Sequence, residues 1–390
     1  MEQVLGDKKD CSGCGACAER CPEKAITMQA DAFGFLYPEI DRQRCIDCGL
    51  CRKICPGAQV VSGNGPQKVV ALRSKDPQII QTSQSGGAFA ELAKCVLAAG
   101  GAVYGAAMGE DGKVFHIRVD RAENLRKLQG SKYVQSRKLG IFRQAEQDLK
   151  AGKTVLFSGT PCQIAGLAAF LGRDYANLYT IDLVCHGVMA PKLWEDYLQY
   201  ARKRFGSFTQ VRFRDKRKNG WRDHWESFQI GGKTRFRNIY RKLFYLDVFL
   251  RDCCYSPEKE QVICRYAGKN RVSDLTIGDF YGIEDTRSTI KDDNTGISLC
   301  LLNSEKGNTM FTRIQDRVYW EEHSFPEVSR KNPHLAGEGK PFRKEQIEKI
   351  RREYLEKGFC YIAGRYAEAS FLGIFKKLKR LPQWWRTKWI

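Results

Sequence analysis

Two copies of one cysteine pattern place the strongest constraint on how this chain can fold. Each copy reads C-x2-C-x2-C-x3-C-P, and both lie near the N-terminus. In two-cluster ferredoxins the first three cysteines of such a motif bind one [4Fe–4S] cluster, and the fourth binds the other cluster. The spacing therefore predicts two clusters with crossed ligation. The first set is Cys11, Cys14, Cys17 and Cys55, and the second set is Cys21, Cys45, Cys48 and Cys51.

Structural zinc is the alternative for these cysteines. Zinc sites usually use C-x2-C pairs that are separated by a longer loop, so two copies of the iron–sulfur spacing fit zinc poorly. Gly13, Gly15 and Gly49 also suit tight turns that direct backbone N–H groups toward sulfide. A two-cluster module passes single electrons, so we expect an electron-transfer protein or an oxidoreductase.

The chain is too long to be a ferredoxin alone. Its 390 residues leave room for two or three domains. No run of 18 apolar residues appears, and the first residues lack a signal-peptide pattern, so we expect a cytoplasmic protein. In such a chain, sixteen cysteines indicate metal ligands more than disulfides.

The net charge of +20 is concentrated outside the first 60 residues. Such an excess favours acidic partners: a phosphate-bearing cofactor, an acidic electron carrier, anionic lipid or nucleic acid. A solvated basic surface is the alternative. The sequence contains no recognised nucleic-acid-binding motif, so we expect no nucleic-acid partner.

The chain divides by composition into segments of different character. Residues 1–60 are dense in cysteine and turns, and 61–68 read as a linker. From 69 to about 182, strand-like runs alternate with helical patterns, which argues for an α/β domain. Strands are predicted at 69–74, 102–108, 114–119, 154–160 and 178–184, and helices at 88–100 and 142–152. Residues 186–340 have more α+β character, and 341–390 read as a helical, basic tail.

Four short stretches extend the pattern beyond the cysteine motifs: SQSGGAF at 83–89, GSKYVQS at 130–136, SGTPCQ at 158–163 and RVSDLTIGDFYG at 271–282. In this order, behind two ferredoxin motifs, they resemble the coenzyme F420 hydrogenase/dehydrogenase beta-subunit family from about 69 to 284. The resemblance implies that 69–185 and 186–340 are two parts of one flavin-binding α/β unit. Members bind FAD and exchange a hydride with a deazaflavin, and photosynthetic relatives reduce chlorophyll-type substrates with ferredoxin electrons.

Several residues of these stretches suit a flavin cofactor. Gly86 and Gly87 precede a helical pattern, where backbone N–H groups can bind phosphate, although an ordinary helix cap is the alternative. A lysine near the flavin ring stabilises the reduced anion and an aromatic side chain can stack on the ring, although a surface lysine and a core tyrosine are the alternatives. The residues that we expect to contact FAD are Ser83, Ser85, Gly86, Gly87, Ser131, Lys132, Tyr133, Gly159, Thr160, Gln163 and Asp279.

Eight cysteines remain outside the two motifs. Cys95, Cys300 and Cys360 lie in apolar patterns and are predicted to be buried. The resemblance implies a third [4Fe–4S] cluster beside FAD, although the C-x2-C pair common in the family is stretched to C-x9-C here. The ligands that we expect are Cys162, Cys185, Cys254 and Cys264, with Cys253 as a replacement for Cys254. Unconnected thiols are the alternative. His186, next to Cys185, is either a proton donor or a partner of a local carbonyl.

The leading functional hypothesis is an FAD and iron–sulfur oxidoreductase that couples hydride chemistry to single-electron transfer. Its substrate would be coenzyme F420 or another small molecule. A non-catalytic electron-transfer subunit that serves a separate reductase is the alternative. The sequence sets neither the substrate nor the direction of electron flow.

The last residues suggest a further contact. From Phe371, apolar side chains recur at helical spacing beside basic ones, and Trp384, Trp385 and Trp389 follow. This composition suits the surface of an anionic membrane, here the inner membrane, or docking on the protein itself or on a partner subunit. Both hypotheses remain open from the sequence.

Overall fold

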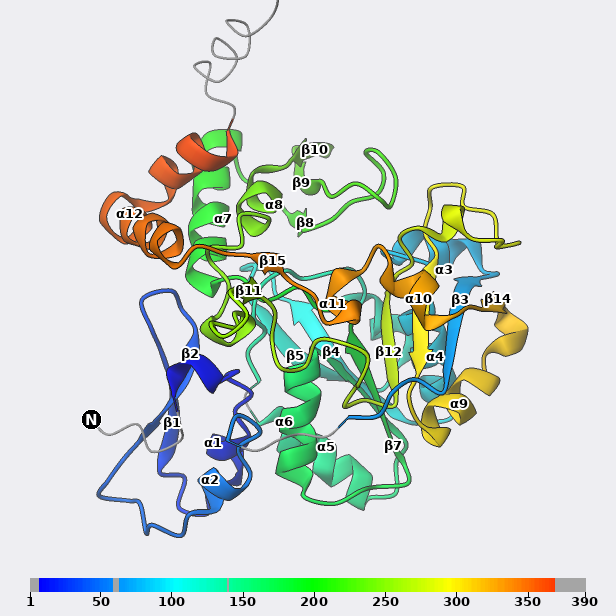
Figure 1. Ribbon diagram of the computed structural model, residues 1–390, viewed down its shortest axis with the longest axis horizontal. Helices are drawn as coiled ribbons and strands as arrows, with labels where there is room; N and C mark the ends of the chain where they lie inside the picture. The colour runs from blue at the N-terminus through cyan, green and yellow to red at the C-terminus, as the bar shows by residue number, and fades with distance from the viewer. Residues whose placement is uncertain (1–6, 59–62, 139, 369–390) are drawn as a thin grey trace, which may run out of the picture.

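The N-terminal module is a small cysteine-rich unit beside a much larger α/β body (Figure 1). In this computed structural model, the described residues are 7–58, 63–138 and 140–368. Gly15 and Gly49 each follow the second cysteine of a motif and begin a short helix with φ of 81° and 68°. The elements of the module are η1 (Lys8–Asp10), α1 (Ala16–Arg20), β1 (Ile26–Ala30), β2 (Leu36–Ile40) and α2 (Leu50–Lys53).

A mixed eight-stranded sheet forms the centre of the large body, in the order β14-β3-β13-β12-β7-β6-β4-β5. Strands β4, β6, β7 and β12 pair in parallel, and the other pairings are antiparallel. Five of these strands coincide with the predicted ones, which confirms that part of the prediction. Their bounds are β3 (Lys68–Ser74), β4 (Ala102–Met108), β5 (Val114–Val119), β6 (Val155–Gly159), β7 (Leu178–Leu183), β12 (Leu275–Asp279), β13 (Ser298–Leu302) and β14 (Val318–Glu322).

Helices cover both faces of this sheet, as expected for strands that are buried on both sides. Val103 and Leu156 pack in one core with α4 (Ala88–Ala98) and α9 (Glu305–Thr312). The alternating residues Tyr104 and Phe157 pack in a second core with α5 (Ile141–Lys150) and α6 (Pro161–Leu171). The predicted helices at 88–100 and 142–152 are therefore confirmed as α4 and α5.

A second body of helices and short strands is inserted between β7 and β12. Its aromatic core includes Trp194, Tyr197, Phe228, Tyr240 and Phe359. Its elements are α7 (Pro191–Phe205), β8 (Gln210–Arg212), β9 (Glu226–Ile230), β10 (Lys233–Arg237), α8 (Ile239–Phe244), η3 (Asp252–Cys254), β11 (Gln261–Val262), β15 (Lys340–Pro341), α12 (Lys344–Ile362) and η6 (Ala363–Ala367). Because β12, β13 and β14 return to the main sheet, residues on both sides of the expected division at 185 share that sheet.

Shorter elements complete the large body. They are α3 (Pro77–Thr82), η2 (Ala122–Lys127), η4 (Ile283–Asp285), η5 (Gln315–Arg317), α10 (Phe325–Ser329) and α11 (Pro333–Ala336). Across the described ranges, none of the helices is long and apolar enough to cross a membrane. The amphipathic segment predicted from Phe371 lies outside the described residues.

Candidate iron–sulfur centres and cofactor site

The second set of cysteines surrounds one pocket of the N-terminal module. Cys21 comes from the first motif, yet it lines a cavity of about 190 Å³ together with the first three cysteines of the second motif. Ile26, Ile40 and Ile46 supply apolar walls to the same cavity. The backbone N–H of Ala25 donates to the Cys21 sulfur over 3.3 Å, the type of bond that tunes a cluster. The cysteines of this cavity are Cys21, Cys45, Cys48 and Cys51.

The first set of cysteines gathers on the side of the module that faces the large body. Burial raises the pKa of the Cys14 thiol to about 11, and the nearby Cys11 and Cys55 charges add to the rise. Burial also raises the pKa of Cys17, and Cys14, Cys11 and Cys55 act in the same direction. These four sulfurs therefore lie close enough to repel one another as thiolates, which favours binding of a shared group of positive metal ions.

Cys14 packs directly on helix α6 of the large body. A Cβ added to Gly166 of that helix would lie 3.0 Å from the Cys14 sulfur and 2.5 Å from its Cβ. The first turn of the same helix carries Cys162. One helix thus connects the first set of cysteines to the edge of the main sheet.

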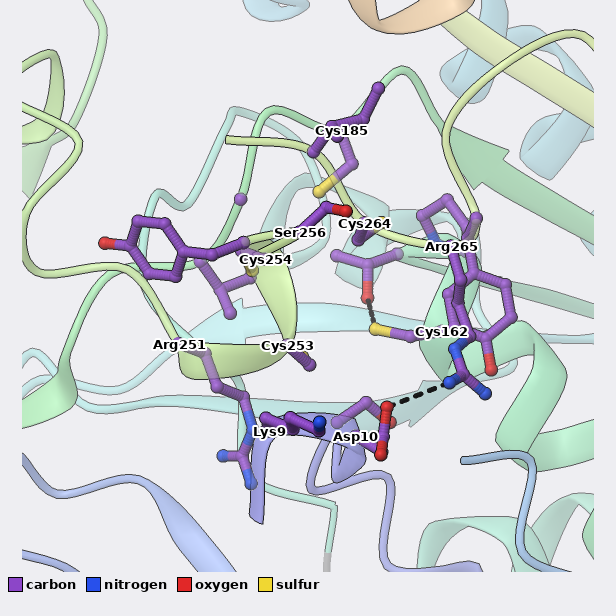
Figure 2. Close-up of a pocket in the computed structure, with 18 of the residues that line it drawn as sticks. Lys9, Asp10, Cys162, Cys185, Arg251, Cys253, Cys254, Ser256, Cys264 and Arg265 are labelled. Atoms are coloured by element: carbon purple, nitrogen blue, oxygen red, sulfur yellow. Dashed lines mark hydrogen bonds and ion pairs between the residues drawn. The ribbon is translucent and has the colours of Figure 1, made fainter. Parts of the chain in front are cut away.

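A third group of cysteines meets at the carboxyl edge of the parallel strands (Figure 2). Cys162 follows β6 and Cys185 follows β7, and parallel neighbours bring their carboxyl ends to the same edge. Thr160 caps helix α6, and its hydroxyl lies 3.1 Å from the Cys162 sulfur. A cavity of about 220 Å³ is lined by Cys162, Cys185, Cys253, Cys254 and Cys264.

Of the two adjacent cysteines in this cavity, Cys253 is turned toward the other thiols. Burial raises the pKa of Cys162, and the next largest cause is the charge of Cys253. Burial raises the pKa of Cys264 to about 12, followed by Cys162 and Cys253. Cys254 packs into the aromatic core of the inserted body and is 7% exposed. The geometry therefore favours Cys253, the replacement considered above, as the fourth member of the third set: Cys162, Cys185, Cys253 and Cys264.

Within the described ranges, no three histidine, cysteine, aspartate or glutamate side chains converge on a point that a single metal ion could occupy. The three sets instead surround two cavities and one tightly packed junction. His186 lines the third cavity, and its Nε2 faces the carboxylate of Asp247 and not a backbone carbonyl. Its predicted alternative role as a carbonyl partner is therefore wrong for this nitrogen.

The three cysteines that were predicted to be buried behave differently from one another. Cys300 on β13 is fully buried, which confirms the prediction. Cys95 is half-buried on α4. Cys360 is exposed on α12, so its predicted burial is wrong. The reason is that this helix turns one face to α7 and leaves the opposite face in solvent, a choice that depends on packing partners.

Beside the third cavity, polar and aromatic side chains form a connected cluster, here called the edge cluster. Arg214 Nη1 donates to Asp279 Oδ2 over 2.5 Å, and the Tyr281 hydroxyl donates to the same oxygen over 2.8 Å. The ring nitrogens of His224 lie 3.1 Å from the Tyr281 hydroxyl and 2.7 Å from the Tyr245 hydroxyl. Burial and then the charge of Arg214 lower the pKa of His224 to about 3, so this histidine is neutral at pH 7.

Comparison with known proteins places this geometry in a family. Residues 152–328 match the family described as the C terminus of the beta subunit of coenzyme F420 hydrogenase/dehydrogenase. Residues 10–58 match the 4Fe-4S dicluster domain. The chain belongs to the coenzyme F420 hydrogenase/dehydrogenase beta-subunit family. This confirms the resemblance inferred from the four short stretches, two of which lie outside the matched range.

The other comparisons are narrower. No curated protein matches the chain. One similar solved structure is a chain from the xenon-derivatised F420-reducing [NiFe] hydrogenase complex of Methanosarcina barkeri, with 17% identity and a TM-score of 0.46. The alignment covers 75% of this chain and 92% of that chain. The dicluster domain implies two [4Fe–4S] clusters, so this member of the beta-subunit family is an iron–sulfur protein of electron transfer.

The residues predicted to contact FAD lie along the carboxyl edge of the sheet, as expected for a ligand site of this fold. Ser83 to Gly87 lie beyond the end of β3, Gly159 ends β6 and Asp279 ends β12. Ser131 and Tyr133 are half-buried on either side of Lys132, and the Tyr133 ring stacks on His224 with a centroid distance of 6.1 Å. The predicted residues therefore share one side of the molecule with the third cavity and the edge cluster.

Several of these side chains already have partners within the fold. Ser85 Oγ donates to the Ile297 carbonyl over 2.7 Å, and Thr160 and Gln163 form a capping box at the start of α6. Lys132 Nζ donates to three carbonyls at the end of η2, and burial lowers its pKa to about 7. These polar groups stabilise the edge itself, and of the predicted residues Thr160 also lines the third cavity.

Gly86 has a structural role that its sequence context did not reveal. A Cβ at this position would lie 2.2 Å from the Leu72 carbonyl oxygen and 2.5 Å from the Ser298 nitrogen. We therefore expect Gly86→Ala to lower the free energy of unfolding by about 3 kcal/mol through overpacking, as a lower midpoint in urea with or without flavin. Gly364→Ala is the control, because nothing lies within 4 Å of an added Cβ there. Equal midpoints for the two variants would contradict this role.

The edge cluster also shows what the sequence left out. Asp279 was identified from its motif, but Arg214, His224 and Tyr245 lie in the inserted body, far from any motif. No spacing signal marks them, because the contact between the inserted body and the end of β12 exists only in the folded chain.

Proposed function

We propose that this member of the family is an oxidoreductase in which three [4Fe–4S] clusters form an electron relay. The relay would run from the second set of cysteines, through the first set, to the third set at the edge of the main sheet. The observation that carries the proposal is the arrangement of these sets. Cys17 lies in α1 and Cys21 directly follows it, while Cys14 rests on the helix that begins at Cys162.

The chemistry of the donors supports a cluster at each position. A [4Fe–4S] cluster is held by four thiolates, and each set supplies four cysteines. Two of the sets line cavities of about 190 Å³ and 220 Å³, which leave space for a group of several atoms. Buried thiols have raised pKa values here, so a metal cluster would supply the positive charge that keeps them deprotonated.

FAD, which the family resemblance implies, would supply the two-electron hydride step that single-electron clusters cannot perform. The edge cluster is the group of side chains best suited to bind beside the third cavity. Arg214 is a buried cation that can attract negative charge, and Tyr133 presents a half-buried ring. His224 stays neutral, and its two ring nitrogens join the hydroxyls of Tyr245 and Tyr281. These residues would orient the cofactor and hold a proton near it.

A non-catalytic electron-transfer subunit is the second candidate, and one observation favours it. The polar groups of Ser85, Thr160, Gln163 and Lys132 are already engaged within the fold. In that case the relay would end at a partner protein, and the third cluster would be the exit point for single electrons. A deazaflavin or another small substrate would then bind to the partner.

Quantification of iron, sulfide and flavin after anaerobic purification of the full chain tests both candidates. We expect about twelve irons per chain, from three four-iron clusters, together with FAD. Twelve irons with no binding of FAD, FMN or a deazaflavin would leave the electron-transfer subunit as the function. Stoichiometric zinc without iron after anaerobic reconstitution would overturn both.

A further inference from the structure

Two buried cations separate the first and third sets of cysteines. We propose that Arg251 and Lys138 form a cationic bridge that raises the reduction potentials of the two clusters on either side of it. The inference rests on the proposed function, because it requires clusters in both sets. Each cation faces one cysteine of each set: Arg251 faces Cys11 and Cys253, and Lys138 faces Cys14 and Cys162.

Arg251 is held rigidly between the N-terminal module and the third cavity. It is fully buried, and its guanidinium donates to the carbonyls of Cys11 and Leu36 over 2.7 Å and 2.9 Å. Its Nη2 lies 3.7 Å from the Cys11 sulfur, and the guanidinium carbon lies 4.1 Å from the centre of the Tyr37 ring. Arg251 also lines the third cavity, from which it extends toward the segment of Lys9 and Asp10 (Figure 2).

The charge of Arg251 is sustained by its surroundings. Burial acts to lower the pKa of Arg251, but the charges of Tyr37, Cys11 and Cys253 outweigh it, so the pKa is raised. This guanidinium therefore remains positive whatever the state of the clusters.

Lys138 occupies the equivalent place on the other side. It is 6% exposed, and its Nζ donates to the Ser136 carbonyl over 3.3 Å. Burial lowers the pKa of Lys138, whereas the Cys14 and Cys162 thiolates act to raise it. The lysine therefore gains most from negative charge at the two sites that it faces.

No ion pair joins either cation to a carboxylate in the described part of the chain. The partners of Arg251 are carbonyls, an amide oxygen, a sulfur and aromatic rings, and that of Lys138 is a carbonyl. Burying an unpaired charge is costly, so the fold is expected to supply anions there. A [4Fe–4S] cluster with four thiolates is such an anion, and two of them would flank this pair of cations.

The electrostatic consequence follows from the charge of the clusters. Each cluster becomes more negative by one charge when it accepts an electron, and no bond is formed or broken. A nearby cation therefore stabilises the reduced form more than the oxidised form, and burial weakens the screening of this attraction. The second set faces neither cation, so its cluster would keep a lower potential. An electron that leaves the second set would move inward, first to the first set and then to the third.

Potentiometric titration monitored by EPR, on the full chain with its clusters, tests the bridge. Lys138→Met is expected to leave the iron content unchanged and to make reduction of the first and third clusters about tenfold less favourable, or 59 mV more negative for one electron. The second cluster should keep its midpoint potential. Lys138→Arg should restore the two shifted midpoints. Met at the exposed Lys113 is the control for a lost surface charge.

Arg251→Lys provides a second measurement, since it keeps the charge and loses the forked hydrogen bonds. We expect full iron content and midpoint potentials close to those of the unmodified protein. Unchanged midpoints in Lys138→Met with full iron content would overturn the bridge. An iron content near eight in the unmodified protein would instead overturn the third cluster and the relay, so the two failures are distinguishable.

Discussion

Replacing Cys21 with alanine is expected to destroy the cluster of the second motif and to spare the cluster of its own motif. Cys21 lines the same cavity as Cys45, Cys48 and Cys51, so the substitution leaves that cluster with three ligands. We expect the full chain to lose about four irons and the EPR signal of one reduced cluster. Iron quantification and EPR after anaerobic purification measure this outcome.

Cys55→Ala is the matched control, because it makes the opposite exchange. Cys55 belongs to the second motif, yet its charge acts on Cys14 and Cys17. Its loss should remove the cluster of the first motif, which lies nearest to Arg251, and should spare the cluster in the Cys21 cavity. If each substitution removed the cluster of its own motif, the crossed ligation would be wrong.

Replacing Cys253 with alanine is expected to remove the third cluster, whereas replacing Cys254 is not. Cys253 acts electrostatically on Cys162 and Cys264, whereas Cys254 packs in the aromatic core. We expect Cys253→Ala to fall from about twelve irons to about eight and to keep the EPR signals of the N-terminal module.

Cys254→Ala should keep all the irons and lose stability instead. Because its side chain is 7% exposed in a packed core, truncation leaves a small cavity and lowers the midpoint of unfolding. Cys162→Ala is a positive control, since its sulfur lies at the centre of the third set. Loss of iron in Cys254→Ala with full retention in Cys253→Ala would reverse the assignment and restore Cys254 as the ligand.

Much of the main sheet was predictable from local patterns. The five predicted strands and two helices are present because their apolar residues recur at the spacing of the structure that they form. Gly87 was predicted to precede a helix and does so with φ of 90°, a backbone conformation that glycine adopts readily. Antiparallel β13 and β14 were not predicted, because their place beside β3 depends on contacts between residues more than 200 positions apart.

The role of Gly86 shows where a local pattern misleads. Two glycines before a helix are typical of a phosphate site, and the same pattern arises when a loop must pass close to two strands. The sequence contains no information on which backbone lies above Gly86. Only the pairing of β3 with β13 brings the Leu72 carbonyl and the Ser298 nitrogen to that position.

The sequence by itself determined the N-terminal module, since the ligands of a cluster within one motif are set by covalent spacing over a few residues. Only the tertiary structure decided between Cys253 and Cys254, because adjacent residues differ in direction and not in position along the chain. It also placed Arg251 and Lys138 between the first and third sets, with 112 positions of chain between the two cations. Charge that is buried between distant segments leaves no periodic signal, because its cost and its compensation arise only after those segments have packed together.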